Sequence, residues 1–129
     1  MDTRVKGIVL KWELWGIVFV ILLGAFWHFI FQLTGECKII GAIAPVNESV
    51  WEHFKLGFWP MCIFAAIEYH YIGKRTSSFF PAKAAALYII PLIIALVFYT
   101  YTAIVGHEIL AVDIATFAVA VAVAQLISY

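Results

Sequence analysis

The sequence feature that most constrains the fold is an apolar run at residues 84–106, which contains no charged residue and no histidine. About 20 apolar residues are enough for a helix to cross the hydrocarbon layer of a bilayer. Three further runs are nearly as apolar: residues 14–31 and 109–129 hold one charged residue or histidine each, and residues 56–73 hold two. All four runs are continuous rather than alternating, which favours membrane-spanning helices over strands.

Composition excludes several classes of protein. The chain is 65% hydrophobic and 12% charged, whereas soluble domains average roughly 45–50% and about 25%. A soluble domain of 129 residues could not bury so much apolar surface. The formal net charge of zero leaves no basic surface for a nucleic acid. These numbers exclude a soluble enzyme, a disordered chain and a nucleic-acid-binding protein, and they predict the lipid bilayer as a partner.

The predicted fold is all-α: an integral membrane helical bundle of four transmembrane helices, forming a single domain over residues 1–129. The expected spans are about 12–34, 54–73, 82–105 and 109–129, and an interfacial helical segment at 47–55 precedes the second. Asn47 is a good N-cap residue for that segment, and it would place Glu48 in the first helical turn. Ala111, Ala115, Ala118 and Ala122 recur at helical spacing, which predicts close packing of the last helix along that face.

Lysine and arginine counts predict the orientation, because cytoplasmic loops carry an excess of both. Six of the eight lie in the amino-terminal tail or between the second and third spans: Arg4, Lys6, Lys11, Lys74, Arg75 and Lys83. Only Lys38 and Lys55 lie on the other side. Both termini are therefore expected in the cytoplasm.

The few polar residues in the spans are the candidate functional residues, since an ionisable group in a membrane is a functional hypothesis by default. With this orientation, several of them meet near the outer face. The candidates for an ion, proton or metal site are His28, Glu48, Glu52, His53 and Asp113. Secondary candidates are Asn47, Glu68, His70, His107 and Glu108.

The outer cluster suggests two kinds of chemistry. Carboxylate and imidazole groups together suit zinc, iron or manganese, and they also suit proton transfer. Glu48 and Glu52 would share a face of one helix at a spacing of four residues, where like charges repel unless a cation or proton intervenes. A divalent metal is the cofactor that fits, although none is required. One haem between two of His28, His53 and His107 is a disfavoured alternative.

Each candidate also has a purely structural interpretation. Glu52 could pair with Lys55, three residues away, and Glu68 could be neutralised by Lys83 or Lys74 across the inner interface. Glu48 could serve as a first-turn acid, and His28 could bond across helices. His107 and Glu108 could be solvated loop residues.

One long segment resembles a known family signature. Residues 44–55 read Ala-Pro-Val-Asn-Glu-Ser-Val-Trp-Glu-His-Phe-Lys and continue into Phe58-Trp59-Pro60. Phe26-Trp27-His28-Phe29 and Asp113-Ile114 fit the same pattern. The chain thereby resembles, from about residue 26 onward, a family of small prokaryotic multi-pass membrane proteins without an assigned activity. The resemblance implies a prokaryotic plasma membrane and a functional group of His28, Asn47, Glu48, Glu52, His53 and Asp113.

The resemblance has two departures. Ala103 stands where the family pattern has glycine. Family members continue past the position of Tyr129, so the resemblance implies either that this chain lacks a final helix or that its sequence is incomplete at the carboxyl end.

Three functions fit these observations. The leading hypothesis is a small membrane protein whose outer site binds or conducts a cation or proton. The second is an accessory subunit of a larger membrane complex, with a membrane-protein partner or a second copy of the chain. The third is a metal-dependent membrane enzyme acting on an apolar substrate, which requires a bound metal with an open coordination position; its catalytic residues are not identified by the sequence.

Overall fold

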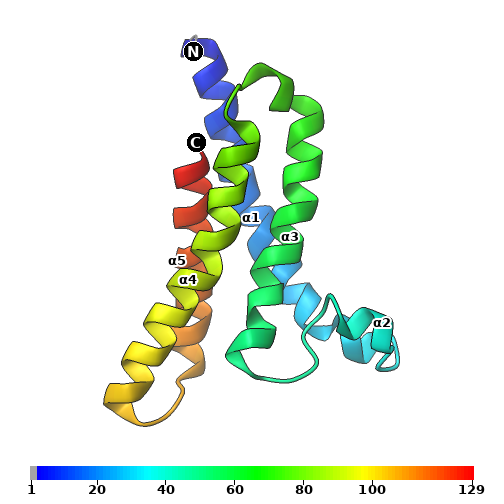
Figure 1. Ribbon diagram of the computed structural model, residues 1–129, viewed down its shortest axis with the longest axis vertical. Coiled ribbons are helices and arrows are strands. Elements are labelled where there is room, and N and C mark those ends of the chain that lie inside the picture. Colours follow the sequence, from blue (N-terminus) through cyan, green and yellow to red (C-terminus); the bar gives the residue numbers. More distant parts are fainter. Residues whose placement is uncertain (1–2) are drawn as a thin grey trace.

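The computed structural model describes residues 3–129 (Figure 1), and all regular structure in this range is helical. The elements are α1 (Thr3–Leu33), α2 (Lys38–Gly41), α3 (Val50–Tyr71), the 3-10 helix η1 (Gly73–Arg75), α4 (Phe79–Val105) and α5 (Leu110–Ser128). The described residues contain no strand. The predicted all-α class is therefore confirmed.

The four long helices pack as a ring. Helix α1 contacts α3 and α5, and α4 also contacts α3 and α5. Both termini lie at one end of the bundle together with η1 (Figure 1), and we call this the terminal end. The connection from α1 to α3, which includes α2, lies toward the opposite end, as does the loop from α4 to α5. We call this the loop end.

Three of the described helices, α1, α4 and α5, are long and apolar enough to cross a membrane. Helix α3 is not among these three. It has 22 residues, but Glu52, Lys55 and Glu68 make it less apolar than the others. Large apolar side chains are exposed on the outside of the bundle, among them Trp15, Leu22, Tyr88 and Ile104. These lengths and this surface suit a membrane protein.

The centre of the bundle is small and tightly packed. Its buried residues are Val20, Met61, Phe64, Ala86, Ile90, Ile94, Ala120, Val121 and Ala124. Two glycines let α1 approach its neighbours. A Cβ at Gly24 would lie 2.7 Å from the Leu56 carbonyl oxygen, and one at Gly16 would collide with the Gln125 side chain. Small residues at such positions allow close contact between membrane helices.

The packed face of α5 differs from the predicted one. Ala111 and Ala115 are exposed and Ala118 and Ala122 are half-buried, whereas Ala120 and Ala124 are fully buried. The prediction was therefore wrong for the first two alanines, because apolar residues occupy every side of this helix. Alanine spacing alone therefore does not reveal which side meets a neighbouring helix.

Candidate functional site

The connection between α1 and α3 is held to the bundle by side chains. Trp27 Nε1 on α1 donates to the Ile43 carbonyl at 2.9 Å. Lys55 Nζ on α3 donates to the Gly41 carbonyl at 2.9 Å. These bonds hold the end of α2 and the residue Ile43 just after it against α1 and α3.

Helix α3 begins two residues later than the sequence predicted. Ser49 is the N-cap, and its hydroxyl accepts from the backbone N–H of Glu52. Asn47 does not cap the helix, because its Oδ1 accepts from the Ser49 N–H at 2.9 Å and closes a local turn. Glu48 consequently lies outside the helix, and it does not share a helical face with Glu52. The prediction of Asn47 as N-cap and of Glu48 in the first turn was wrong.

The displaced Glu48 lies between two histidines. Its Oε2 is 3.4 Å from His28 Nε2 on α1 and 3.4 Å from His53 Nε2 on α3. One ligand atom from each residue lies within 4.8 Å of the other two. The imidazole centroids are 5.5 Å apart. We call this group of three residues the two-histidine cluster, and it is a geometry that could hold a metal ion.

The backbone selects the tautomer of one histidine. His53 Nδ1 lies 2.8 Å from the Ser49 carbonyl oxygen, which can only accept, so Nδ1 carries the proton in this bond. Neutral His53 then presents the lone pair of Nε2 toward Glu48. In many metal sites, the ring nitrogen that does not bind the metal donates its hydrogen to a carbonyl or carboxylate, and this hydrogen bond orients the imidazole.

Solvent reaches the two-histidine cluster. The side chain of Glu48 is 74% exposed, and those of His28 and His53 are 31% and 30% exposed. The cluster is thus partly open on the carboxylate side and partly enclosed on the imidazole side.

Glu52 is engaged elsewhere. Its Oε2 accepts from Lys55 Nζ at 2.7 Å and from the Val46 N–H at 3.1 Å, which confirms the ion-pair alternative for this residue. Glu52 lies in the first turn of α3, before the span expected at 54–73. Burial raises the pKa of the Glu52 carboxyl, but the Lys55 hydrogen bond, the Val46 N–H and the Lys55 charge outweigh it and leave the pKa below its ordinary value.

Asp113 also has its own partner. Its Oδ1 accepts from the Tyr101 hydroxyl at 2.7 Å, and that hydroxyl oxygen accepts from the Ile109 N–H at 3.0 Å. This chain of bonds ties the start of α5 to the end of α4. In the described residues, neither Asp113 nor Glu52 belongs to the group that could hold a metal.

The remaining secondary candidates are dispersed. His107 and Glu108 are exposed in the loop before α5, where His107 Nδ1 contacts the Glu108 carbonyl at 3.0 Å. His70 is exposed near the end of α3 and packs edge-on against Tyr71. Glu68, by contrast, is fully buried.

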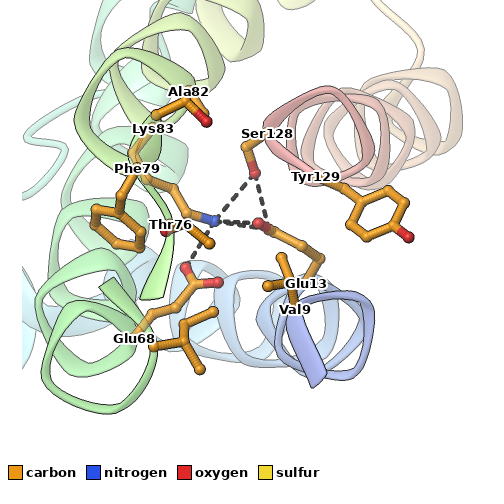
Figure 2. Close-up of a pocket in the computed structure, with 11 residues that line it drawn as sticks. Val9, Glu13, Glu68, Thr76, Phe79, Ala82, Lys83, Ser128 and Tyr129 are labelled. Atoms are coloured by element: carbon orange, nitrogen blue, oxygen red, sulfur yellow. Dashed lines mark hydrogen bonds and ion pairs between the residues drawn. The ribbon is translucent and has the colours of Figure 1, made fainter. Parts of the chain in front are cut away.

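Glu68 belongs to a second polar group, at the terminal end, that the sequence did not predict as a whole. Figure 2 shows the carboxylates of Glu13 and Glu68 pointing at the ammonium group of Lys83. Lys83 Nζ lies 2.7 Å from Glu13 Oε2 and 2.6 Å from Glu68 Oε2. It also donates to Ser128 Oγ at 3.0 Å and to Gln125 Oε1 at 3.3 Å. We call these five residues the buried lysine network.

The network joins all four long helices. Glu13 comes from α1, Glu68 from α3, Lys83 from α4, and the Gln125 and Ser128 side chains from α5. The charged side chains of Glu13, Glu68 and Lys83 are at most 5% exposed. The Glu68–Lys83 pairing that the sequence suggested is present, and Glu13 is the additional partner.

Comparison with known proteins identifies the family. The model of a family of unknown function, DUF6512, matches residues 1–129. The chain belongs to this family. Its membership confirms the predicted resemblance to an uncharacterised family. No curated protein and no solved structure matches the chain, so the function of this DUF6512 member has to be inferred from its own geometry.

A periodic signal for the missed network residues is present in the sequence of this DUF6512 member. On α1, Glu13 lies in the same buried row as Val9, Gly16, Val20 and Gly24. On α5, Gln125 and Ser128 continue the row of Ala120, Val121 and Ala124. A polar residue on the same helix face as a series of small residues is expected to lie inside the bundle, because small residues mark the face that packs against other helices. Glu13 was overlooked because it borders the apolar run instead of interrupting it.

Proposed function

We propose that this chain is a four-span membrane protein whose two-histidine cluster binds a divalent transition-metal cation at the outer face of the membrane. The observation that carries the proposal is the convergence of His28 Nε2 and His53 Nε2 on one Glu48 oxygen, at 3.4 Å each. These donors come from two helices and the turn between them, so they meet only in the folded protein.

The spacing of the donors supports one shared ion. Two ligand atoms that each lie about 2.0–2.1 Å from an ion at tetrahedral angles are about 3.3–3.4 Å apart. The two His–Glu separations of 3.4 Å match this value. Imidazole nitrogens favour zinc, manganese, iron or cobalt over magnesium or calcium, which prefer oxygen ligands. Two histidines and one carboxylate also leave coordination positions open to water.

The packing of α3 supports a fourth span at about 54–73. Its 22 residues correspond to about 33 Å at 1.5 Å per residue, enough to cross the hydrocarbon layer. It packs against α1 and α4, two helices that could themselves span. Its charged residues Lys55 and Glu68 each have an oppositely charged partner, which lowers the cost of placing them near lipid.

Charge distribution supports the outer location of the cluster. The start of α1 and the 3-10 helix η1 lie at the terminal end and carry Arg4, Lys6, Lys11, Lys74 and Arg75 (Figure 1). Helix α2 and the start of α3 lie toward the loop end and carry Lys38 and Lys55. The positive-inside rule then puts the terminal end in the cytoplasm. The two-histidine cluster would face the outside, where the exposed Glu48 carboxylate allows an ion to enter from water.

A metal titration tests the proposal. Purified protein stripped with a chelator is titrated with Zn²⁺ by calorimetry, and with Co²⁺, whose absorption spectrum reports the number and kind of ligands. We expect one ion per chain. His53→Gln and Glu48→Gln should weaken binding by more than the roughly 10–100-fold that loss of an outer-shell partner costs. Lower pH should weaken binding as well, because ligands must be deprotonated.

Matched controls come from the opposite loop of the same end. His107→Gln and Glu108→Gln change the same residue types at exposed positions outside the cluster, and both should bind as wild type does. Equal Zn²⁺ affinity in wild type, His53→Gln and Glu48→Gln would rule out the cluster as the binding site.

A further inference from the structure

The buried lysine network contains more negative than positive charge. Glu13 and Glu68 both lie against the single ammonium group of Lys83. With all three groups ionised, the network would carry one uncompensated negative charge. An unpaired charge in a buried site is very costly, and such a group usually becomes neutral instead.

The described residues around the adjoining cavity supply no second cation. The titratable groups that meet in the network are Glu13 on α1, Glu68 on α3 and Lys83 on α4; Tyr129 also lines the adjoining cavity, but its hydroxyl points away from Lys83 (Figure 2). Gln125 and Ser128 on α5 are neutral hydrogen-bonding groups. Among the described residues that line the adjoining cavity, Lys83 is the one basic side chain.

The two carboxylates are not equivalent. Both oxygens of Glu13 accept from Lys83 Nζ, at 2.8 and 2.7 Å, and Oε2 also accepts from the Ser128 hydroxyl at 2.8 Å. Glu68 touches Lys83 alone, and within the described chain neither of its oxygens has a partner in hydrogen-bond geometry. Hydrogen-bond donors stabilise the charged form of a carboxylate. Glu13 has such donors and Glu68 does not, so protonation costs less free energy at Glu68 than at Glu13.

A cavity gives water access to this place. It has a volume of about 40 Å³ and is lined by Glu13, Glu68, Lys83 and Ser128, with Thr76 and Ser78 from the connection before α4 (Figure 2). A water molecule needs a cavity of roughly 10–15 Å³ and several polar partners. The cavity satisfies both conditions, so water inside it can deliver a proton to the network.

We propose that the buried lysine network is a proton-binding site, in which Glu68 takes up one proton from water in the adjoining cavity while Glu13 stays ionised against Lys83. The hydronium ion gives its proton to a Glu68 oxygen and becomes water, with no other bond made or broken. The network is then neutral. This site is separate from the two-histidine cluster and does not depend on metal binding there.

Charge balance predicts the effect of each substitution. Either Glu68→Gln or Glu13→Gln leaves one carboxylate against one ammonium group, so neither variant should hold the proton. Lys83→Gln leaves two carboxylates without a cation, so two protons should be bound. A simple salt bridge without a bound proton predicts no protonated carboxyl group in wild type.

Infrared spectroscopy of the full chain counts these protons. Protein containing ¹³C-labelled glutamate is measured in detergent with a chelator present, at neutral pH, in H₂O and in D₂O. We expect wild type to show the carbonyl stretch of one protonated glutamate, which shifts with the label and again in D₂O. The band should vanish in Glu68→Gln and Glu13→Gln. The controls are Glu36→Gln and Glu108→Gln, both at exposed loop positions, which should keep it.

The wild-type measurement decides the question even if a variant fails to fold, as judged by its size-exclusion profile. Absence of a protonated glutamate band in wild type at neutral pH would overturn the proposal. A band that persists in folded Glu68→Gln and Glu13→Gln would also overturn it, because the proton would then lie outside the network. A doubled band in Lys83→Gln would support the charge count.

Discussion

The two ends of the bundle hold their charged residues in opposite ways. At the loop end, Glu48 is 74% exposed and meets two histidines that are themselves partly open. At the terminal end, Glu13, Glu68 and Lys83, from α1, α3 and α4, are at most 5% exposed, and both carboxylates lie against the one ammonium group. Both groups use α1 and α3, so the same pair of helices supports an open site and a closed one.

The difference shows how exposure determines what a charged group can do. An exposed carboxylate is stabilised by water when no ion is bound, so it can bind and release an ion reversibly. A buried one has no such alternative and needs a partner inside the protein. The loop-end cluster therefore suits reversible binding of a cation, whereas the terminal-end network suits fixed ion pairing and uptake of the smallest cation, a proton.

Removal of Lys83 is expected to have the largest effect on stability. Lys83→Met leaves two buried carboxylates without their cation, and breaking a buried pair typically costs about 3–5 kcal/mol. Lys55→Met is the matched control at the loop end, where the Glu52–Lys55 pair is partly exposed and should cost about 1 kcal/mol or less. Thermal unfolding in detergent compares the two variants. Equal losses would contradict the contrast between a closed and an open end.

Metal binding at the loop end should have the second largest effect on the stability of the folded protein. Zn²⁺ at about 100 times its dissociation constant should raise the free energy of unfolding by about 2.7 kcal/mol. The gain should disappear in His28→Gln and persist in His70→Gln, a histidine outside the cluster on α3. Unfolding curves with and without Zn²⁺ measure this. A gain that survives in His28→Gln would mean that the ion binds elsewhere.

Two glycines on α1 test how tightly the network is enclosed. Gly16→Val would push against Gln125 and Phe64, and such overpacking typically costs about 1–3 kcal/mol. Gly7 has nothing within 4 Å of an added Cβ, so Gly7→Val should change stability little. Thermal unfolding distinguishes them. Similar stability of both variants would show that the network is looser than its contacts indicate.

The smallest effect concerns pH at the loop end. Because Lys55 and the Val46 N–H hold the pKa of Glu52 below its ordinary value in the folded protein, their contribution to stability is present at neutral pH. It is lost as pH falls through the lowered folded value. The stability difference between wild type and Lys55→Met should therefore shrink in acid. A difference that grows as the pH falls would contradict this pairing.

The sequence predicted a contact correctly where the spacing of two residues on one helix is enough to bring them together. Glu52 and Lys55 are three residues apart on one helix, so their pairing was among the expected alternatives. It was less successful where a turn intervenes. Asn47 and Ser49 are both good N-cap residues, and only the local hydrogen bonds of the turn determined that Ser49 caps the helix and that Glu48 turns toward the histidines.

The amino-acid sequence was enough to predict the helical class of this protein. Long apolar runs with few charges favour helices that could cross a membrane, because each helix satisfies its own backbone and needs no information about its neighbours. Which polar residues meet became clear only from the packing of the helices. These contacts depend on the rotation of each helix about its own axis. Hydropathy does not specify this rotation when every face of a helix carries apolar residues. Rotation directed Asp113 to Tyr101, and it brought Glu13 and Glu68 to Lys83.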